Sequence, residues 1–233
     1  MKIDYAELFK LIKNTSFKKV GYDVDYAVTV DHSKKIVYLI FEESSSNKDW
    51  KVNLRFLRKC YKRKLYKKQV SCMKCHRGFG QAYKEVNDII MSEYIQACEE
   101  NPDYKFIICG WSYGGGMSQI AAEDFNFRTR TDKSNPSTGF KPSVVTFGAP
   151  KIFSRKSAKY VREECCFKVV QVAQHNDPVT HVVPWDWSLN LKKSWRVGEK
   201  NNFFKWFKAR KYHCNYDDAS LYPNDTYILS VDL

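Results

Sequence analysis

Apolar positions along the chain follow two alternating patterns, short continuous runs and stripes with helical spacing. The run at residues 36–41 is unbroken and rich in β-branched residues, which predicts a buried strand, with residues 28–30 expected to pair beside it. Similar runs predict strands at 105–109, 144–147 and 167–173, whereas apolar steps of three and four predict helices at 81–100, 117–125 and 158–164. Strands that alternate with helices indicate an α/β fold with a mostly parallel central sheet flanked by helices.

The chain is long enough for one sizeable domain. It has 233 residues, of which 43% are hydrophobic, and it shows neither an internal repeat nor a long linker, so we expect a single domain over residues 1–233. No apolar run approaches the roughly 20 residues of a transmembrane helix. Charged residues interrupt the apolar positions at the start of the chain. We therefore expect no secretory signal and a cytoplasmic location, with peripheral contact to membranes.

The net charge of +13 is concentrated in one part of the chain. Residues 51–77, the basic segment, carry eleven Lys or Arg and no Asp or Glu, so the rest of the chain is nearly neutral. Between residues 49 and 66, apolar residues recur every four positions, which predicts a helix with one apolar stripe and a basic remainder. Such a surface suits anionic lipid, nucleic acid or an acidic partner.

A glycine-rich turn follows the predicted strand at 105–109 and precedes a predicted helix. It reads Gly110-Trp111-Ser112-Tyr113-Gly114, a G-x-S-x-G pattern in the strand–turn–helix context that gives this pattern its meaning. A serine on so sharp a turn needs small neighbours two residues away, because strand and helix approach each other closely there. We therefore interpret Ser112 as a nucleophile and the backbone amide of Tyr113 as an oxyanion donor.

A serine nucleophile needs a general base, and the base needs an acid that orients it. In serine hydrolases built on an α/β sheet, the chain order is serine, acid, histidine. Asp177 directly follows the predicted strand at 167–173 and is the candidate acid. Only His181 and His213 lie beyond it. His181 is too close to Asp177 to return over the serine from a separate loop, so His213 is the candidate base.

Five short blocks occur in order along the chain. They are Ser44-Ser45-Ser46 followed by Asp49-Trp50, His76-Arg77-Gly78-Phe79, Gly110-Trp111-Ser112-Tyr113-Gly114-Gly115, Thr146-Phe147-Gly148-Ala149-Pro150 and Asp177-Pro178-Val179-Thr180-His181. In this order they resemble the class 3 (fungal-type) lipase family, over about residues 36 to 213. Two positions depart from the family pattern. Glu42-Glu43 stand where the family has Arg-Gly, and Trp111 stands where it has His.

The resemblance implies an α/β-hydrolase fold and a serine esterase that acts on acyl lipids, phospholipid or glycerolipid, through an acyl-enzyme. It implies the catalytic triad Ser112, Asp177 and His213. It also implies that Ser44 supplies the first oxyanion donor and Tyr113 the second. No metal or cofactor is expected for this chemistry.

The family also carries a mobile lid, which the resemblance places at residues 51–75. We expect this basic lid-like helical segment to dock the protein on an anionic membrane surface and to open the site. Two alternatives remain open. One is a weak or inactive hydrolase scaffold that binds anionic surfaces or nucleic acid through the basic segment, with Glu42-Glu43 beside the oxyanion site as its best support. The other is deacylation of thioesters on lipidated proteins. We expect lipid, not nucleic acid, as the partner.

The run Cys72-Met73-Lys74-Cys75-His76 matches the attachment pattern of c-type haem. We set haem aside, because its attachment needs an export compartment and because His76 already belongs to a lipase-like block. Zinc is set aside because no second Cys pair has suitable spacing. Cys98 and Cys109 lie in apolar helix and strand patterns, which predicts that both are buried packing residues.

Overall fold

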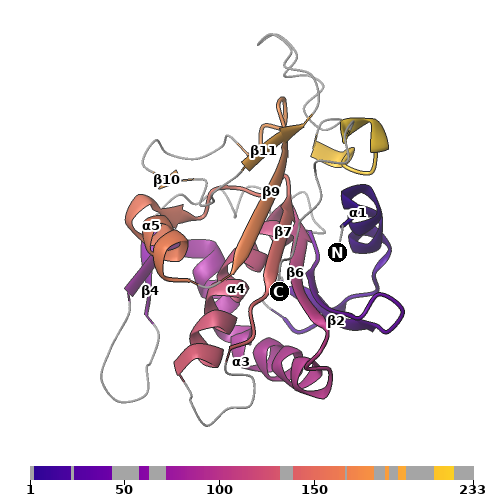
Figure 1. Cartoon of the computed structure of the whole chain (residues 1–233). Coiled ribbons are helices and arrows are strands. Elements are labelled where there is room, and N and C mark those ends of the chain that lie inside the picture. The colour runs from indigo at the N-terminus through magenta and orange to yellow at the C-terminus, as the bar shows by residue number, and fades with distance from the viewer. Residues whose placement is uncertain are drawn as a thin grey trace.

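The computed structural model describes residues 3–21, 24–43, 58–62, 72–131, 139–165, 167–180, 187–188, 194–197 and 213–222. Within these ranges a seven-stranded sheet forms the centre, and helices cover both of its faces (Figure 1). In their spatial order the strands are β1 Lys18–Lys19, β2 Asp25–Asp31, β3 Ile36–Phe41, β6 Lys105–Trp111, β7 Ser143–Phe147, β9 Lys168–Gln174 and β11 Ser194–Val197.

The sheet is mostly parallel, as the sequence predicts. The pairs β3–β6, β6–β7, β7–β9 and β9–β11 are parallel, and only β1–β2 and β2–β3 are antiparallel. Every residue of β3 and of β7 is buried, because helices shield both faces. Strands in that position read as mostly apolar runs, which is why these two are visible in the sequence. Cys98 and Cys109 are fully buried, as predicted.

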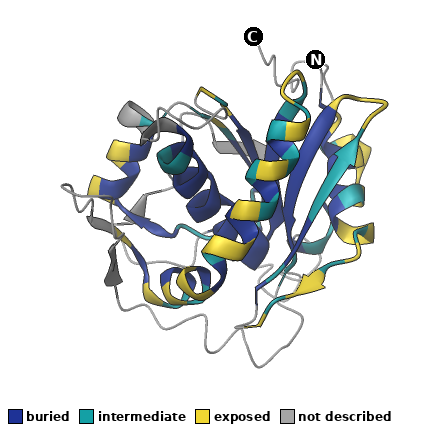
Figure 2. Cartoon of the chain, turned by 90° about the horizontal axis from the view of Figure 1, so that it is seen from below, coloured by how far each residue is buried: buried dark blue, intermediate teal, exposed yellow. Residues whose placement is uncertain are grey.

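Two long helices cover one face of the sheet. They are α3 (Arg77–Glu100) and α4 (Tyr113–Thr131), and α5 (Arg155–Glu164) follows further along the chain. The apolar stripe of α3 packs with Phe106 and Ile108 of β6 and with Val144 of β7 in one core. All three helices were predicted, and each begins a few residues earlier than its apolar pattern suggests. Figure 2 shows buried strands between helices whose outward sides are exposed.

The opposite face is covered by α1 (Tyr5–Asn14). This helix begins at Asp4, whose side chain accepts a hydrogen bond from the backbone N–H of Glu7 and thereby caps the first turn. Its buried residues Leu8, Phe9 and Ile12 pack with Ile107 and Cys109 of β6 in a second core, together with residues of β7, β9 and the segment 213–222. The sheet therefore separates two cores.

A smaller antiparallel sheet lies beside the first, and one of its strands falls where the sequence predicted a helix. Its order is β10 (Trp187–Ser188), β8 (Phe153–Ser154), β5 (Cys72–His76) and β4 (Arg58–Lys62). The pattern at residues 49–66 predicted a helix, but β4 is a strand that pairs with β5 from Arg58 opposite His76 to Lys62 opposite Cys72. The prediction was wrong because residues four apart share one face of a strand as well as one face of a helix. The other residues of 49–66 lie outside the described part of the chain.

Among the residues that the structure describes, no helix combines the length and the apolar character that crossing a bilayer requires.

Candidate active site

Ser112 occupies the turn between β6 and α4. Its φ is +53°, a left-handed conformation that residues other than glycine rarely adopt. The turn is held by backbone hydrogen bonds, because the N–H of Ser112 donates to the carbonyl of Phe147 at 2.9 Å and the N–H of Gly116 donates to the carbonyl of Ser112 at 3.2 Å. The predicted strained strand–serine–helix turn is therefore present, and Ser112 is 5% exposed.

The glycines of the motif are required by close backbone contacts. A Cβ atom on Gly114 would lie 2.3 Å from the carbonyl oxygen of Phe41 on β3, and one on Gly110 would lie 2.4 Å from the carbonyl carbon of Gly114. Real Cβ atoms essentially never come within 3.0 Å of another atom. Strand, turn and helix thus approach so closely that only glycine fits at both positions.

The two predicted oxyanion donors differ in what the structure shows of them. Tyr113 is the first residue of α4, so its amide belongs to the helix turn whose N–H groups have no acceptor within the helix. Its ring packs against Phe79 of α3, with the ring centres 4.8 Å apart. Ser44 lies outside the described residues, two positions beyond Glu42, and so does His181.

Asp177 lies in the loop after β9, where the sequence places the acid. It is fully buried, and its own backbone N–H donates to the carbonyl of Gln174 at 3.1 Å. One carboxylate oxygen, Oδ1, accepts from the backbone N–H of Val179 at 2.9 Å. The hydroxyl of Thr180 donates to the Asp177 carbonyl at 2.9 Å. These contacts hold the side chain in one orientation and leave the other oxygen, Oδ2, for further donors.

His213 is brought to Asp177 from a segment 36 positions further along the chain. Its Nδ1 lies 2.9 Å from Oδ2 of Asp177. A carboxylate only accepts hydrogen bonds, so Nδ1 donates, and in the neutral ring Nε2 carries the lone pair that a general base needs. The indole Nε1 of Trp111, beside Ser112, donates to the backbone carbonyl of His213 at 2.9 Å. Acid, base and serine turn are thus joined by direct contacts.

Tyr216 is a site residue that the sequence analysis missed. Its hydroxyl donates to Oδ2 of Asp177 at 2.6 Å and accepts from the backbone N–H of Gln174 at 3.0 Å. Burial and the nearby Asp177 carboxylate raise the pKa of Tyr216 well above its ordinary value, so its proton remains in place. Its position three residues after His213 was the only signal in the sequence. That signal is weak in a chain with 15 tyrosines.

Gly148 is the second missed residue. It follows β7 and has a φ of +54°. A Cβ atom there would lie 2.6 Å from Oδ2 of Asp177 and 3.0 Å from the ring of His213, so the glycine leaves room for the acid–histidine pair. The block Thr146-Phe147-Gly148 contained this signal, but the sequence did not reveal what the glycine faces.

Glu42, one of the two acidic residues that differ from the family pattern, contacts Asp25. The Glu42 carboxyl is hydrogen-bonded to that of Asp25 on the neighbouring strand β2, and burial together with this contact raises the pKa of Glu42. With a raised pKa, Glu42 keeps its proton to a higher pH than an ordinary glutamate does. Among the described residues, no three His, Cys, Asp or Glu side chains gather where they could hold a metal ion.

Ser112, Gly148 and Asp177 follow β6, β7 and β9, and the carboxyl ends of parallel strands meet at one edge of a sheet. A mostly parallel sheet between helices, with a strained serine turn and a buried Asp–His pair at this edge, is the arrangement of the α/β-hydrolase fold. Residues 38–187 match the sequence model of the family described as Lipase (class 3), and the chain belongs to that family. The match includes Ser112 and Asp177 but ends before His213, so the interpretation of His213 as the base depends on its contacts with Asp177 and Trp111.

Relatives and solved structures agree with this family. The lipase of Rhizomucor miehei is 30% identical over 158 residues, which are 68% of this chain and 40% of that protein. A putative lipase of Saccharomyces cerevisiae is 28% identical over 147 residues, 58% of this chain and 42% of that one. A solved triacylglycerol lipase, whose catalytic centre is described as a serine protease triad, has a TM-score of 0.58 at 26% identity and covers 72% of this chain and 60% of its own. The chain spans about two fifths of the length of the two curated relatives.

Proposed function

We propose that this chain is a serine-dependent carboxylic ester hydrolase that acts on acyl lipids, with Ser112, Asp177 and His213 as its catalytic triad. The observation that carries the proposal is the 2.9 Å contact between Nδ1 of His213 and Oδ2 of Asp177 at the sheet edge that also presents Ser112. The family membership supports it, as does the serine protease triad described for the related triacylglycerol lipase.

In the proposed reaction, Oγ of Ser112 attacks the ester carbonyl while Nε2 of His213 accepts the hydroxyl proton. Asp177 stabilises the resulting imidazolium. The backbone amides of Tyr113 and Ser44 stabilise the negative oxygen of the tetrahedral intermediate. His213 then protonates the departing alcohol, and an acyl-enzyme remains on Ser112. A water molecule, deprotonated by His213, attacks this ester and releases the fatty acid.

A fluorophosphonate probe and a short-chain p-nitrophenyl ester test this proposal, because both require an activated serine. We expect the wild-type protein to react with both and Ser112→Ala to react with neither. Ser143→Ala, which removes a buried hydroxyl at the start of β7, is the matched control and should retain both reactions. A folded wild-type protein that neither labels nor hydrolyses the ester would instead support the inactive scaffold.

For the substrate we propose glycerolipid esters presented at an anionic surface, with phospholipid and thioester substrates as the alternatives to be separated by assay. Two relatives are named as secreted mono- and diacylglycerol lipases, from Penicillium cyclopium and Fusarium solani, and this supports a glycerolipid ester. The positive charge of the basic segment supports the proposal that this surface is anionic. Its described strand β4 contains three basic residues within Arg58–Lys62, at the edge of the small sheet.

Vesicle binding tests the role of these charges. Near an anionic surface each basic residue contributes on the order of 1 kcal/mol at low salt, so replacing the three basic residues of β4 by Gln should weaken binding by up to roughly 100-fold. Replacing the exposed Lys10, Lys84 and Lys141 by Gln removes the same charge elsewhere and is the control. Equal losses in both variants on phosphatidylserine vesicles would refute a dedicated docking segment.

A further inference from the structure

Helix α1 lies outside the residues that match the lipase family, yet it contacts the groups that hold the acid and the base. Its residue Phe9 is fully buried at the middle of the core on the α1 face. The Phe9 ring meets the rings of Trp111, Phe147 and Tyr216, with centre-to-centre distances of 5.3, 5.1 and 5.5 Å. A single side chain of α1 is thus in contact with three aromatic residues around the site.

Two of these three aromatic residues bind the acid–histidine pair directly. Trp111 donates its indole N–H to the His213 carbonyl, and its ring centre lies 5.5 Å from that of the imidazole. Tyr216 donates its hydroxyl to the Asp177 carboxylate. Trp111 and Tyr216 therefore each contact one member of the acid–histidine pair, and Phe9 packs against both rings.

Further contacts join α1 to the segment that carries the histidine, residues 213–222. The rings of Tyr5 and Tyr222 stack with their centres 6.0 Å apart, and Lys13 lies 3.4 Å from Asp217. The Tyr222 hydroxyl donates to the carbonyl of Tyr216 at 2.9 Å. Both ends of α1 are therefore in contact with the segment that carries His213.

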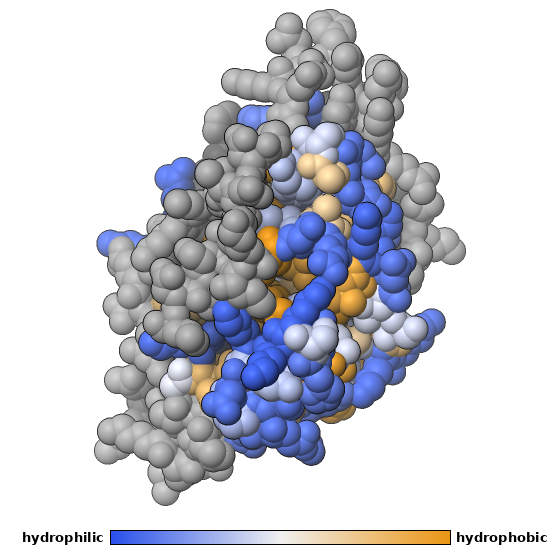
Figure 3. All heavy atoms as spheres, turned by 45° about the vertical axis from the view of Figure 1, so that its right-hand side comes forward, coloured by the Kyte–Doolittle hydropathy of each residue, from blue (hydrophilic) through white to orange (hydrophobic). Residues whose placement is uncertain are grey.

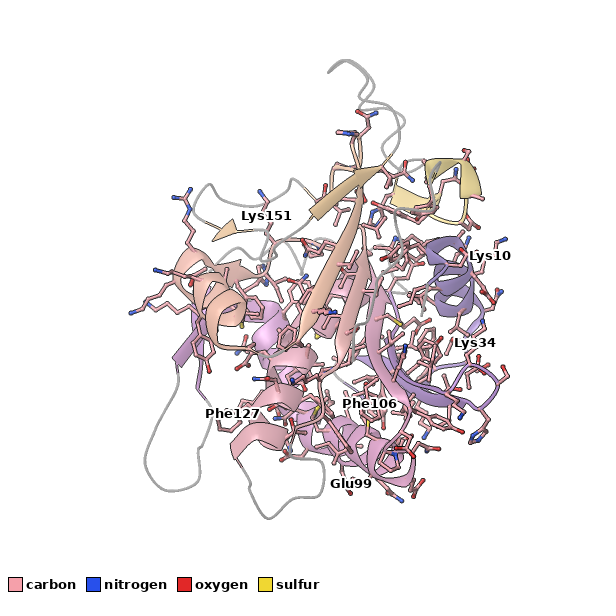
Figure 4. All side chains as sticks on the ribbon, viewed as in Figure 1. Lys10, Lys34, Glu99, Phe106, Phe127 and Lys151 are labelled. Carbon is pink, nitrogen blue, oxygen red and sulfur yellow. The ribbon has the colours of Figure 1, made fainter. Side chains whose placement is uncertain are left out.

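The side of α1 opposite to Phe9 faces away from the sheet. Lys10 is exposed, and its side chain points away from the sheet (Figure 4). The face of the molecule that carries α1 presents mostly hydrophilic residues around a limited apolar area (Figure 3). Lys13 is also exposed, but its Nζ lies 5.7 Å from the centre of the Phe9 ring, so Lys10 and not Lys13 is the position to change without altering a contact of Phe9.

We propose that α1 positions the catalytic residues, with Phe9 and Trp111 as positioning residues: Phe9 fixes the rings of Trp111 and Tyr216, and these fix His213 and Asp177. The inference rests on the proposed ester hydrolysis and adds to it an element outside the family match. Packed aromatic rings hold one arrangement, because interiors are close-packed and a shortened side chain leaves a gap into which neighbours tilt. A tilt of either ring displaces the base from Ser112.

The first test compares Phe9→Leu with Phe125→Leu. Phe125 is also fully buried but packs against Tyr94 in the core on the other face, so both variants lose a similar buried volume. At 25 °C, with both variants folded by circular dichroism, we expect Phe9→Leu to lower kcat about 10-fold, because small misplacements of catalytic groups are costly, with KM within about two-fold. Phe125→Leu should keep the wild-type kcat. Equal effects on kcat would show that the loss comes from general destabilisation and would overturn the proposal.

The second test is Trp111→Phe, which keeps an aromatic ring and removes the N–H that binds His213. We expect kcat and the rate of fluorophosphonate labelling to fall together by about 10-fold, with KM unchanged, because the base and not substrate binding is displaced. Wild-type values of both rates in Trp111→Phe would overturn its role. A wild-type protein without any esterase activity refutes the proposed function itself, and the positioning proposal falls with it. Normal wild-type activity that neither variant lowers refutes the positioning proposal alone.

Discussion

Replacing Gly114 by Ala tests the geometry of the serine turn directly. The added Cβ atom would lie 2.3 Å from the carbonyl oxygen of Phe41, 2.5 Å from that of Glu42 and 2.8 Å from the carbonyl carbon of Phe41. All three are backbone atoms of β3 and the residue after it, so no side-chain rotation relieves the clash. The end of β3 must move away from α4.

The size of the effect follows from these distances. Reaching even the 3.0 Å limit of Cβ contacts from 2.3 Å requires a backbone shift of about 0.7 Å, and reaching an ordinary contact of 3.4 Å requires about 1.1 Å. Overpacking of this kind costs about 3 kcal/mol, and the better helix propensity of alanine returns less than about 1 kcal/mol so near the start of α4. In a chain of this length, each kcal/mol lowers Tm by about 2–4 °C. We therefore expect Gly114→Ala to melt about 4–12 °C below the wild-type protein.

Differential scanning calorimetry and ester hydrolysis measure the two consequences. The rate of ester hydrolysis should fall even at temperatures where the variant is fully folded. The reason is that the displaced residues Phe41 and Glu42 lead to the proposed oxyanion donor Ser44. Gly78→Ala is the matched control near the start of α3, where the nearest atoms to an added Cβ are those of His76 at 3.4 and 3.5 Å, an ordinary contact. Its Tm should equal or exceed that of the wild-type protein. A Gly114→Ala variant with wild-type Tm and activity would refute the close approach of α4 to β3.

Three further changes test individual contacts. Tyr216→Phe should lower the free energy of unfolding by about 1.5–3 kcal/mol and reduce kcat, since a buried carboxylate loses a donor; urea denaturation and ester hydrolysis measure both. Burial lowers the pKa of His76 from 6.5 to about 4, so the unfolded state binds its proton first as the pH falls. Wild-type stability should therefore drop by up to about 3 kcal/mol between pH 6.5 and 4, and His76→Gln should remove that drop in urea denaturation at several pH values. The raised pKa of Glu42 has the opposite sign: its stabilising effect is complete below the ordinary carboxyl pKa and is lost as the pH rises through the raised value. Glu42→Gln should accordingly be more stable than the wild-type protein at pH 7 and show no such advantage at pH 4.

The central part of the fold was predictable because its signals are local. β3, β6 and β7 are almost entirely buried and therefore read as mostly apolar runs, and the glycines around Ser112 are required by a close backbone contact in the turn itself. The strand β4 was predicted wrongly because a four-residue spacing fits a helix and a strand equally, and only the pairing with β5 decides between them.

The contacts that hold the candidate catalytic residues were not predictable in the same way, because they join distant parts of the chain. Trp111 and His213 are 102 positions apart, and neither an apolar pattern nor a motif relates them. The helical spacing of Tyr5, Leu8, Phe9 and Ile12 was a usable signal for α1, which the sequence analysis did not use. Even with that helix predicted, its contact with the site depends on which face of the sheet it covers.

The two neighbours of Ser112 show why both cores matter to the proposed chemistry. Trp111 packs in the core on the α1 face, with Phe9, whereas Tyr113 packs in the core under α3 and α4, with Phe79. The serine turn is thus the point where the sheet's two cores meet. The core under α3 and α4 holds Tyr113, whose amide is the proposed oxyanion donor, and the core under α1 packs against the segment that carries the proposed base. Substitutions at Phe79, which packs against Tyr113, should therefore act on stabilisation of the proposed oxyanion, and those at Phe9, which packs against Trp111, on proton transfer. Because Phe79 and Phe9 lie in different cores, their losses of transition-state stabilisation, calculated as RT ln of the kcat ratio, should add in the double variant.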